Sequence, residues 1–440
     1  MLKASISNCT NTSLYLANKA ATLWTTKRIK ADCLSGLPPI LSPARMTGRA
    51  RAAGSLTGGN LGATGKTGAK PAKSRRRSGS HLRRPPRPRE QTAQPDIIVD
   101  APQAPQPAQV PRFTRIPGET VYGALDLGTN NCRLLLARPA ETGFEVVDAF
   151  SRIVRLGEGV SATGELSQAA IERTIKALRV CANKLKWWDV RRFRLIATEA
   201  CRMAGNGDRF IEQARIEIGL DLEIIDRKTE AGLAAAGASP LICGKAKSVI
   251  VFDIGGGSTE ILWLNIRNGR YEIKDWTSIP AGVVTVAEKF GGKHVSSESF
   301  AAMRAHVGEL AKPFSDRLRN GAAHGPVPDH LLGTSGTVTT VCGIHQNLRR
   351  YDRARVDGSW MLGAEIAAVT RDLLSMTYEQ RQTSPCVGPE RADLVLAGCA
   401  ILEEIRELWP ADRVRVADRG LREGILTSLM NEDGKYARPT

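Results

Sequence analysis

The sequence lacks several features that would assign it to a familiar class of protein. No run of eighteen apolar residues occurs in its 440 residues, which excludes a membrane-spanning helix. Its nine cysteines form no CxxC pair, and their odd number and scatter predict reduced thiols in a reducing compartment. The six histidines show neither HxxxH nor HExxH spacing, so a zinc hydrolase is not expected.

Acidic residues are scarce in the first quarter of the chain. Residues 1–115 hold 20 Lys and Arg against 4 Asp and Glu, a net charge of +16, while the whole chain holds 62 against 45, or +17. Because Gly, Ser, Arg and Pro dominate residues 1–115, we expect a disordered N-terminal extension. Arginines within residues 75–89 would let it contact RNA or another polyanion, although a solvated linker explains them more simply.

The first residues do not resemble a secretory signal, because Asn and Lys interrupt each apolar stretch. Their basic, acid-poor composition is similar to that of a transit peptide, unless Met46 is the true first residue. Between these alternatives we expect a cytoplasmic protein that makes no contact with membranes.

The ordered part of the chain begins with a pattern that occurs twice. An apolar run ends in Asp126 and a Gly-rich turn, two further apolar runs follow, and the same order recurs around Asp253, 127 residues later (253 − 126). Helical patterns such as residues 167–188, with Ser167 as the N-cap, alternate with strands, which argues for an α/β fold. We therefore predict two related lobes around a central cleft, at residues 116–246 and 247–440, the second with C-terminal helices.

The two Gly-rich turns are suited to binding phosphate. They read DLGTNN at residues 126–131 and DIGGGST at residues 253–259. Glycine lets the backbone approach an anion and turn its N–H groups toward it, and the hydroxyl and amide side chains add donors. The carboxylate at the end of each strand is suited to Mg²⁺ or its waters. One such turn alone is more simply a hairpin, whereas two facing turns predict a phosphate site.

Seven motifs resemble those of the exopolyphosphatase / guanosine pentaphosphate phosphohydrolase (Ppx/GppA) family, in the order and spacing of that family. They are DLGTNNCRLLL, RLGEGV, ATEACR, DRKTEAG, DIGGGSTEI, GTSGT and DRGLREG, and they cover about residues 120–430. The resemblance implies two actin-like (ribonuclease H-like) lobes of the sugar kinase/Hsp70/actin superfamily. It is closest to the short form of the family, without an additional C-terminal HD-type domain.

The resemblance also implies roles for single residues. Glu230 matches the general base that takes a proton from the attacking water, although by itself a first-turn helix carboxylate is the simpler interpretation. Arg133 and Arg202 match arginines that neutralise phosphoryl oxygens, with a structural ion pair as the alternative for each. The remaining matches are Asp126, Asp253 and Glu260 as Mg²⁺ ligands, and Gly128, Thr129, Asn130, Gly255, Gly256, Gly257, Ser258, Gly333, Thr334, Ser335 and Gly336 as phosphate contacts.

The activity that the resemblance implies is Mg²⁺-dependent release of terminal orthophosphate from inorganic polyphosphate, from guanosine pentaphosphate of the stringent response, or from both. A sugar-kinase-like ATPase is the alternative within the fold, and Glu230 with the missing sugar-binding signature disfavours it. A non-catalytic sensor that binds the alarmone or polyphosphate is the alternative of another class. The carboxylates disfavour the sensor, because a binder of anions does not need buried negative charge. The resemblance also suggests a homodimer.

Overall fold

The computed structural model describes residues 118–319 and 327–436. The predicted N-terminal extension and its arginine cluster lie outside the described residues. Within the described part, no helix is both long and apolar enough to cross a membrane. The seven cysteines of this part are all buried free thiols, as the sequence predicted.

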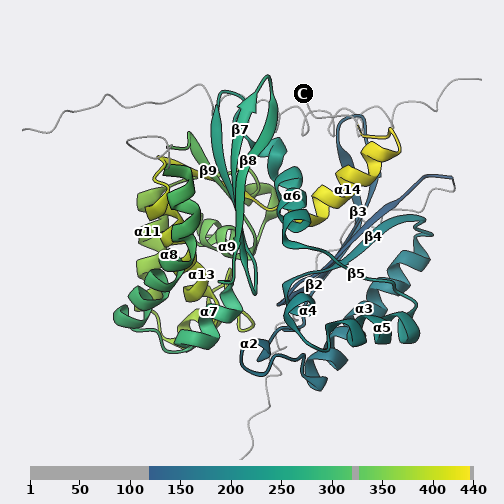
Figure 1. The fold of residues 1–440 in the computed structure, drawn as a ribbon, viewed down its shortest axis with the longest axis horizontal. Coiled ribbons are helices and arrows are strands. Elements are labelled where there is room, and N and C mark those ends of the chain that lie inside the picture. The colour runs from purple at the N-terminus through teal and green to yellow at the C-terminus, as the bar shows by residue number, and fades with distance from the viewer. Residues whose placement is uncertain (1–117, 320–326, 437–440) are drawn as a thin grey trace, which may run out of the picture. The chain divides into compact units, whose positions relative to one another are not determined.

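The first sheet has the strand order β3-β2-β1-β4-β5 (Figure 1). Its first three strands form an antiparallel meander, and β4 and β5 extend it in parallel from β1. The strands are β1 Tyr122–Leu127, β2 Asn131–Pro139, β3 Phe144–Ile153, β4 Arg192–Ala197 and β5 Glu223–Ile224.

The second sheet repeats this plan in the order β10-β11-β9-β6-β7-β8. Here β6, β7 and β8 form the meander, β9 and β11 extend it in parallel, and β10 closes the edge antiparallel to β11. The strands are β6 Ser248–Ile254, β7 Thr259–Arg267, β8 Arg270–Ile279, β9 His330–Thr334, β10 Trp360–Leu362 and β11 Arg413–Ala417. The two mixed sheets, each with the same meander and parallel extension, confirm the predicted α/β fold and its repeated hairpins.

Helices cover both sheets, and one of them follows the predicted cap closely. The helix expected over residues 167–188 is α3, where the Ser167 hydroxyl accepts a hydrogen bond from the Ala170 N–H. The helices are α2 Val160–Thr163, α3 Gln168–Trp187, α4 Glu199–Met203, α5 Gly207–Ile218, α6 Arg227–Ala238, α7 Val283–Phe290, α8 Ser297–Arg319, α9 Gly336–His345, α10 Arg353–Val356, α11 Gly363–Ser375, α12 Tyr378–Thr383, α13 Val395–Leu408 and α14 Leu421–Glu432.

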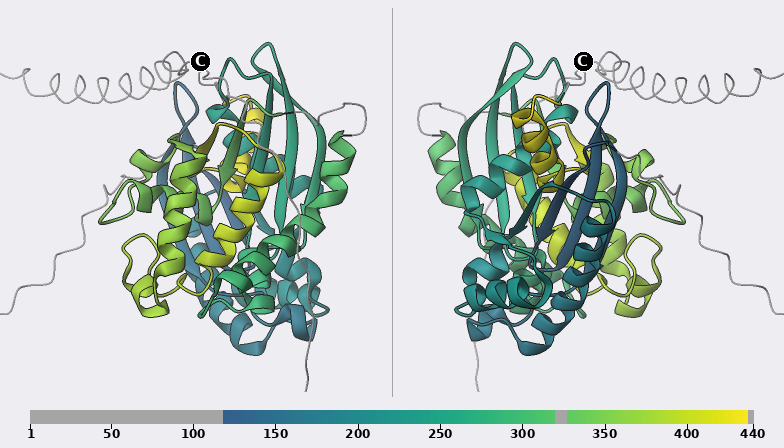
Figure 2. Two further views of the ribbon diagram at one scale, coloured as in Figure 1. Left: turned by 90° about the vertical axis from the view of Figure 1, so that its left-hand side faces the viewer. Right: turned by 90° about the vertical axis from the view of Figure 1, so that its right-hand side faces the viewer.

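Two helices each pack on the sheet that the other half of the chain forms. The C-terminal α14 packs on β1, β2 and β4 of the first sheet, whereas α6 packs on β6 to β9 of the second (Figures 1 and 2). They cross at glycines, because a side chain on Gly237 would collide with the Gly420 carbonyl and one on Gly424 with the Leu233 carbonyl. The lobe boundary at residues 246/247 therefore stays a prediction.

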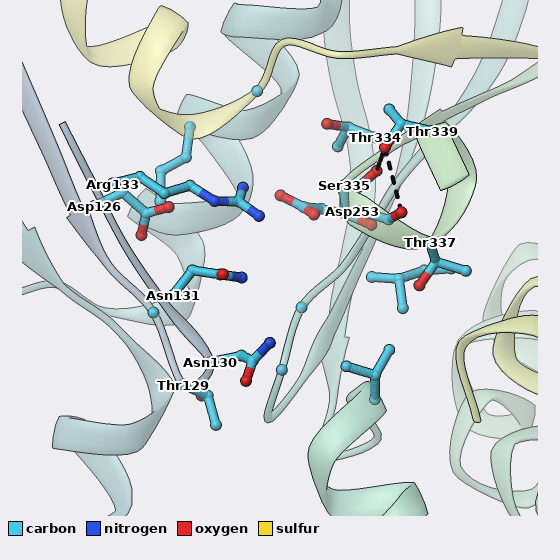
Figure 3. Close-up of a pocket in the computed structure, with 18 of the residues that line it drawn as sticks. Asp126, Thr129, Asn130, Asn131, Arg133, Asp253, Thr334, Ser335, Thr337 and Thr339 are labelled. Atoms are coloured by element: carbon cyan, nitrogen blue, oxygen red, sulfur yellow. Dashed lines mark hydrogen bonds between the residues drawn. The ribbon is translucent and has the colours of Figure 1, made fainter. Parts of the chain in front are cut away.

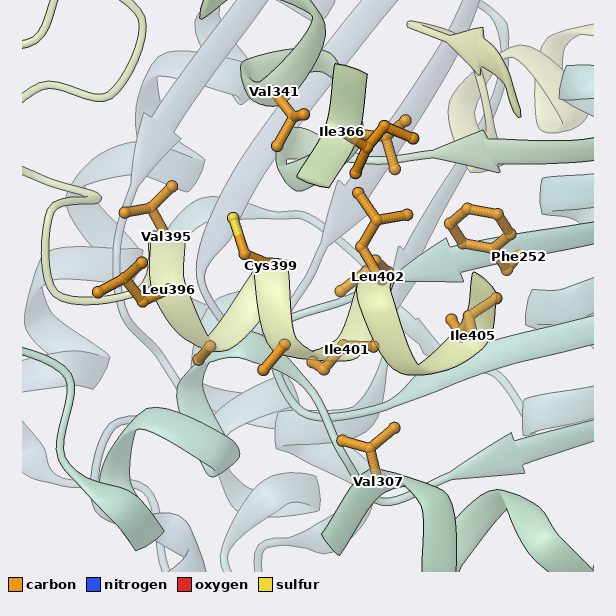
Figure 4. Packing of buried hydrophobic residues seen from close by; sticks show 14 of the residues in the cluster. Phe252, Val307, Val341, Ile366, Val395, Leu396, Cys399, Ile401, Leu402 and Ile405 are labelled. Carbon is orange, nitrogen blue, oxygen red and sulfur yellow. The ribbon is translucent and has the colours of Figure 1, made fainter. Parts of the chain in front are cut away.

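The largest apolar core lies in the second lobe around α13. This helix presents Val395, Leu396, Cys399, Leu402 and Ile405 to its neighbours, all of them buried. Figure 4 shows these side chains among residues of β6, α8, α9 and α11. Their burial holds α13 and the start of α9 in fixed positions at the edge of the sheet, where the functional site forms.

Candidate active site

One cavity collects most of the residues that the sequence predicts for the site. It measures about 580 Å³ and lies between the two Gly-rich turns and the starts of α9 and α14 (Figure 3). Its wall includes, from the predicted set, Asp126, Gly128, Thr129, Asn130, Arg133, Glu230, Asp253, Gly255, Gly256, Gly257, Ser258, Glu260, Thr334, Ser335 and Gly336.

Two predicted residues do not line the cavity. Arg202 lies behind Glu230, to which its Nη2 donates a hydrogen bond of 2.9 Å. Gly333 lies inside β9, where a side chain would collide with the ring of Phe252. Arg202 therefore reaches the cavity through the carboxylates that it binds, and the position of Gly333 is explained by packing.

The two hairpins place opposite charges at matched positions. On the first, Asp126 of β1 is in register with Arg133 of β2. On the second, Asp253 of β6 is in register with Glu260 of β7. Because cross-strand partners project to the same face of a sheet, each pair points into the cavity together. Figure 3 shows Asp126 and Arg133 on one wall and Asp253 on the other.

The Gly-rich turns touch each other at the floor of the cavity. A methyl group on Gly256 would lie 2.8 Å from the Cβ of Thr129 and 3.1 Å from the backbone N of Asn130. One on Gly257 would lie 2.9 Å from the Thr129 hydroxyl. The second turn thus uses glycine because the first turn occupies the space that side chains would need.

Several buried polar atoms of the cavity have no partner among the described residues. These are the amide oxygens of Asn130 and Asn131 and the hydroxyl of Ser335. Ser335 has a φ of 93°, a strained value for a residue other than glycine, and it precedes α9 without capping it. The first N–H groups of α9 therefore face the cavity with a partial positive charge, which suits a phosphate oxygen.

The carboxyl groups of the cavity are hard to ionise together. Burial, followed by the charge of Glu260, raises the pKa of Glu230 to about 9. Burial, with the charges of Glu260 and Asp126, raises the pKa of Asp253 to about 7. Burial also raises the pKa of Asp126, against the opposing charge of Arg133. A cation in the cavity would relieve this repulsion and favour the ionised forms.

The donor set suits a cation that prefers oxygen. Among residues 118–319 and 327–436, no three His, Cys, Asp or Glu side chains gather into a ready-made metal cluster. Mg²⁺ is commonly held by one or two carboxylates together with phosphate oxygens and waters. The buried carboxylates of Asp126, Asp253 and Glu260 are therefore compatible with Mg²⁺ that binds together with a phosphate chain.

Glu230 enters the cavity from the first turn of α6. Asp226 caps this helix, with its carboxylate accepting a hydrogen bond of 2.7 Å from the Thr229 N–H. The Oε2 atom of Glu230 accepts from Arg202, and its Oε1 atom accepts from no residue that the structure describes. The side chain is 12% exposed. One carboxylate oxygen is thus fixed and the other is available to a ligand.

Three arginines of the cavity wall make no ion pair with any described residue. They are Arg133 on β2, Arg391 in the loop before α13, and Arg422 at the start of α14. Burial lowers the pKa of Arg422, as expected for a guanidinium without a carboxylate partner at contact distance. Unpaired guanidinium groups suit the oxygens of a phosphate chain.

Sequence reasoning assigned no role to several of these residues. Arg422 lies in the DRGLREG motif and Glu199 in the ATEACR motif, so the motifs mark both segments but not these two side chains. Arg391 stands in no motif. Its guanidinium would lie 3.9 Å from a methyl group on Gly336, which places it beside the start of α9. Only the fold brings it to the site.

A two-lobed α/β fold whose cavity combines facing carboxylates, unpaired arginines and an open helix N-terminus defines a phosphate-handling protein. The family model described as the Ppx/GppA phosphatase family matches residues 135–433. The chain belongs to the Ppx/GppA phosphatase family, and this confirms the family predicted from its motifs.

Relatives of known name agree with this assignment. Exopolyphosphatase 2 of Mycobacterium tuberculosis is 32% identical over 328 residues, which cover 70% of this chain and 98% of that protein. Guanosine-5'-triphosphate,3'-diphosphate pyrophosphatase of Vibrio vulnificus is 27% identical, over 71% of this chain and 60% of the relative. Both names denote enzymes that hydrolyse phosphoanhydride bonds, which confirms the predicted enzyme class.

Solved structures show the same fold. The Ppx/GppA family member of Aquifex aeolicus is 28% identical, with a TM-score of 0.60 over 71% of this chain and 98% of that structure. An exopolyphosphatase of Cytophaga hutchinsonii is 22% identical, with a TM-score of 0.65 over 72% of this chain and 98% of that structure. The second similarity shows the fold alone.

Proposed function

We propose that this protein releases terminal orthophosphate from inorganic polyphosphate, from guanosine pentaphosphate or from both, with Mg²⁺ and with Glu230 as the general base. The observation that carries the proposal is the position of Glu230, whose Oε2 is held by Arg202 while Oε1 remains without a partner among the described residues. The names of the Mycobacterium and Vibrio relatives support the two substrates.

Mg²⁺ would be held by Asp126, Asp253 and Glu260 together with oxygens of the phosphate chain. When bound, it neutralises charge on the chain and on the leaving group. We propose this cation because the buried carboxylates repel one another and because their donors are all oxygen.

The protein's own residues supply the remaining parts of the reaction. The phosphate chain lies between the two turns, with donors from Thr129 and Asn130 on one side and from the start of α9 on the other. Arg133 and Arg422 compensate the charge of the terminal phosphoryl group. Oε1 of Glu230 accepts a proton from a water as the water oxygen forms its bond to phosphorus and the bridging P–O bond breaks. The electron pair of that bond leaves with the shortened chain.

The test is orthophosphate release by the full chain with Mg²⁺, with long-chain polyphosphate and guanosine pentaphosphate offered separately. Glu230→Gln removes the proton acceptor while retaining the size of the side chain. It is expected to lower kcat by about 10³-fold, within the range of general-base contributions, and to leave polyphosphate binding by calorimetry intact. Turnover retained by Glu230→Gln would overturn the assignment of the base.

Substrate choice is a separate outcome of the same measurement. Release from one substrate alone names the preferred substrate, and release from neither by the wild-type chain contradicts the proposed activity. A homodimer, a cytoplasmic location and a polyanion contact through residues 75–89 stay predictions.

A further inference from the structure

Arg202 is held on three sides behind the proposed base. Its Nε donates to Oε2 of Glu199 at 2.9 Å, and its Nη2 donates to the same oxygen. Its Nη1 donates to the Ile225 carbonyl at 2.6 Å. Nη2 also donates to Glu230 Oε2, at 2.9 Å. The Nε–Nη2 edge of Arg202, one of the edges on which arginine can bind a carboxylate, is therefore already occupied by Glu199.

Glu199 is the carboxylate that occupies this edge. It lies at the start of α4, its side chain is 6% exposed, and it also lines the cavity. Arg227 binds its other side, with Nη2 donating to Oε1 at 2.6 Å. Burial alone would raise the pKa of Glu199, but the hydrogen bonds from Arg227 and Arg202 outweigh burial and lower it. Glu199 is thus a buried anion in a chain of alternating charges.

We infer that Glu199 is a positioning residue for the hydrolysis: by occupying the Nε–Nη2 edge of Arg202, it keeps that edge from Glu230 and so keeps Oε1 of Glu230 free for the attacking water. The inference rests on the proposed function. Without Glu199, the Nε–Nη2 edge of Arg202 could bind both oxygens of Glu230. Oε1 would then be directed at the guanidinium and away from water, and the base would be weaker.

Removal of Glu199 should also weaken Glu230 as a base through the loss of its negative charge. The groups that face Glu230 are Arg202 of α4, Glu260 of β7 and Asp126 of β1. Loss of the nearby Glu199 charge leaves the positive charge of Arg202 less compensated, which stabilises ionised Glu230. Geometry and charge therefore both predict that the Glu199 variant carries a more acidic and less effective base.

The test is steady-state hydrolysis by the full-length Glu199→Gln chain with inorganic polyphosphate and Mg²⁺. On the plateau above the acid limb, where Glu230 is ionised in both proteins, we expect kcat to fall about 10- to 100-fold, in line with the loss of part of a general-base contribution. KM should change less than about threefold, since no phosphate contact is lost. The acid limb of the kcat profile should move to lower pH. An unchanged kcat, or a lower kcat with an unmoved acid limb, would overturn the inference.

Two control variants separate positioning from stability. Glu212→Gln breaks the Glu212–Arg215 pair, which has the same i,i+3 spacing as Glu199–Arg202 but lies exposed on α5. It should leave kcat and the acid limb unchanged. Arg227→Gln removes positive charge from the other side of Glu199, so the acid limb should move to higher pH. A shift of the same sign in Glu199→Gln and Arg227→Gln would indicate a structural role instead.

Failure of the inference can be distinguished from failure of the proposed function. If Glu230→Gln retains turnover, the base is misassigned whatever Glu199 does. If Glu230→Gln is inactive and Glu199→Gln behaves like the wild type, the base stands and the positioning role is wrong. Binding of inorganic triphosphate by calorimetry shows whether each variant still folds its site, and a Glu199→Gln chain that fails to bind contradicts the expected KM.

Discussion

The hairpins that open the two lobes share a backbone and differ in charge at one matched position. Asp126 pairs with Arg133 in the first, and Asp253 pairs with Glu260 in the second. Asp253 follows Asp126 by 127 residues (253 − 126), and Glu260 follows Arg133 by the same number (260 − 133), so the positions are equivalent. The same scaffold therefore presents a positive charge to the cavity from one lobe and a second negative charge from the other.

The surroundings of each residue match its charge. Oε1 of Glu260 accepts hydrogen bonds of 2.8 Å from the hydroxyls of Ser258 and Ser278, which fix a buried carboxylate in place. Arg133 has no ion-pair partner among the described residues and remains available to a ligand. The two hairpins thus each carry one matched carboxylate, and at the second position the first lobe adds an arginine suited to a phosphoryl group while the second adds a carboxylate suited to a cation.

Reversing the charge of the first hairpin should impair the hydrolysis most strongly. Arg133→Glu gives both hairpins the acidic pattern of the second, so a phosphate chain would meet negative charge from both lobes. We expect kcat/KM for polyphosphate to fall by about 10³-fold, as for loss of a strong electrostatic contact in an active site. Orthophosphate release at subsaturating polyphosphate measures this.

Glu260→Gln is the matched change on the second hairpin. It should raise the Mg²⁺ concentration needed for half-maximal activity, while calorimetric binding of polyphosphate changes only a few-fold. If the two variants instead have the same Mg²⁺ dependence, the proposed division of roles between the hairpins is wrong.

The sequence predicted the hairpins and α3 because their signals are local. Gly-rich turns follow apolar strands, and Ser167 stands directly before the helix that it caps. The packing of α14 on the first sheet could not be predicted. It depends on the contact between Gly237 and Gly420, which are 183 residues apart (420 − 237) and give no local signal. For the same reason, the motifs predicted the carboxylates but not the contact between Glu199 and Arg227, which depends on how α4 and α6 pack.

A second difference between the lobes concerns acid stability. Histidine is absent from residues 118–246, whereas the second lobe buries His330, whose Nε2 accepts from the Cys243 N–H. Burial, with the charges of Arg413 and Arg415, lowers the pKa of His330 to about 4, below the usual 6.5. Between these values the unfolded chain binds a proton that the folded chain does not, so stability falls as the pH falls.

The expected loss of unfolding free energy from His330 is about 2 kcal/mol between pH 7.5 and pH 5. Urea unfolding at the two pH values measures it, and His330→Gln should reduce the difference by that amount. His345→Gln, which removes an exposed histidine of α9, serves as the control and should not. An equal pH dependence in wild type and His330→Gln would contradict the buried neutral histidine.

A more modest change in stability is expected at the glycines of the two turns. A methyl group on Gly256 would lie 2.8 Å from the Cβ of Thr129, whereas one on Gly128 would find its nearest neighbour, the Asn131 carbonyl oxygen, at 3.6 Å. Gly256→Ala must therefore push the turns apart, at a cost of about 1–2 kcal/mol in unfolding free energy. Gly128→Ala should be neutral or slightly stabilising, because it restricts the unfolded chain without a clash. Urea unfolding of both variants at pH 7.5 measures the difference, and equal effects would mean that the two turns do not touch in solution.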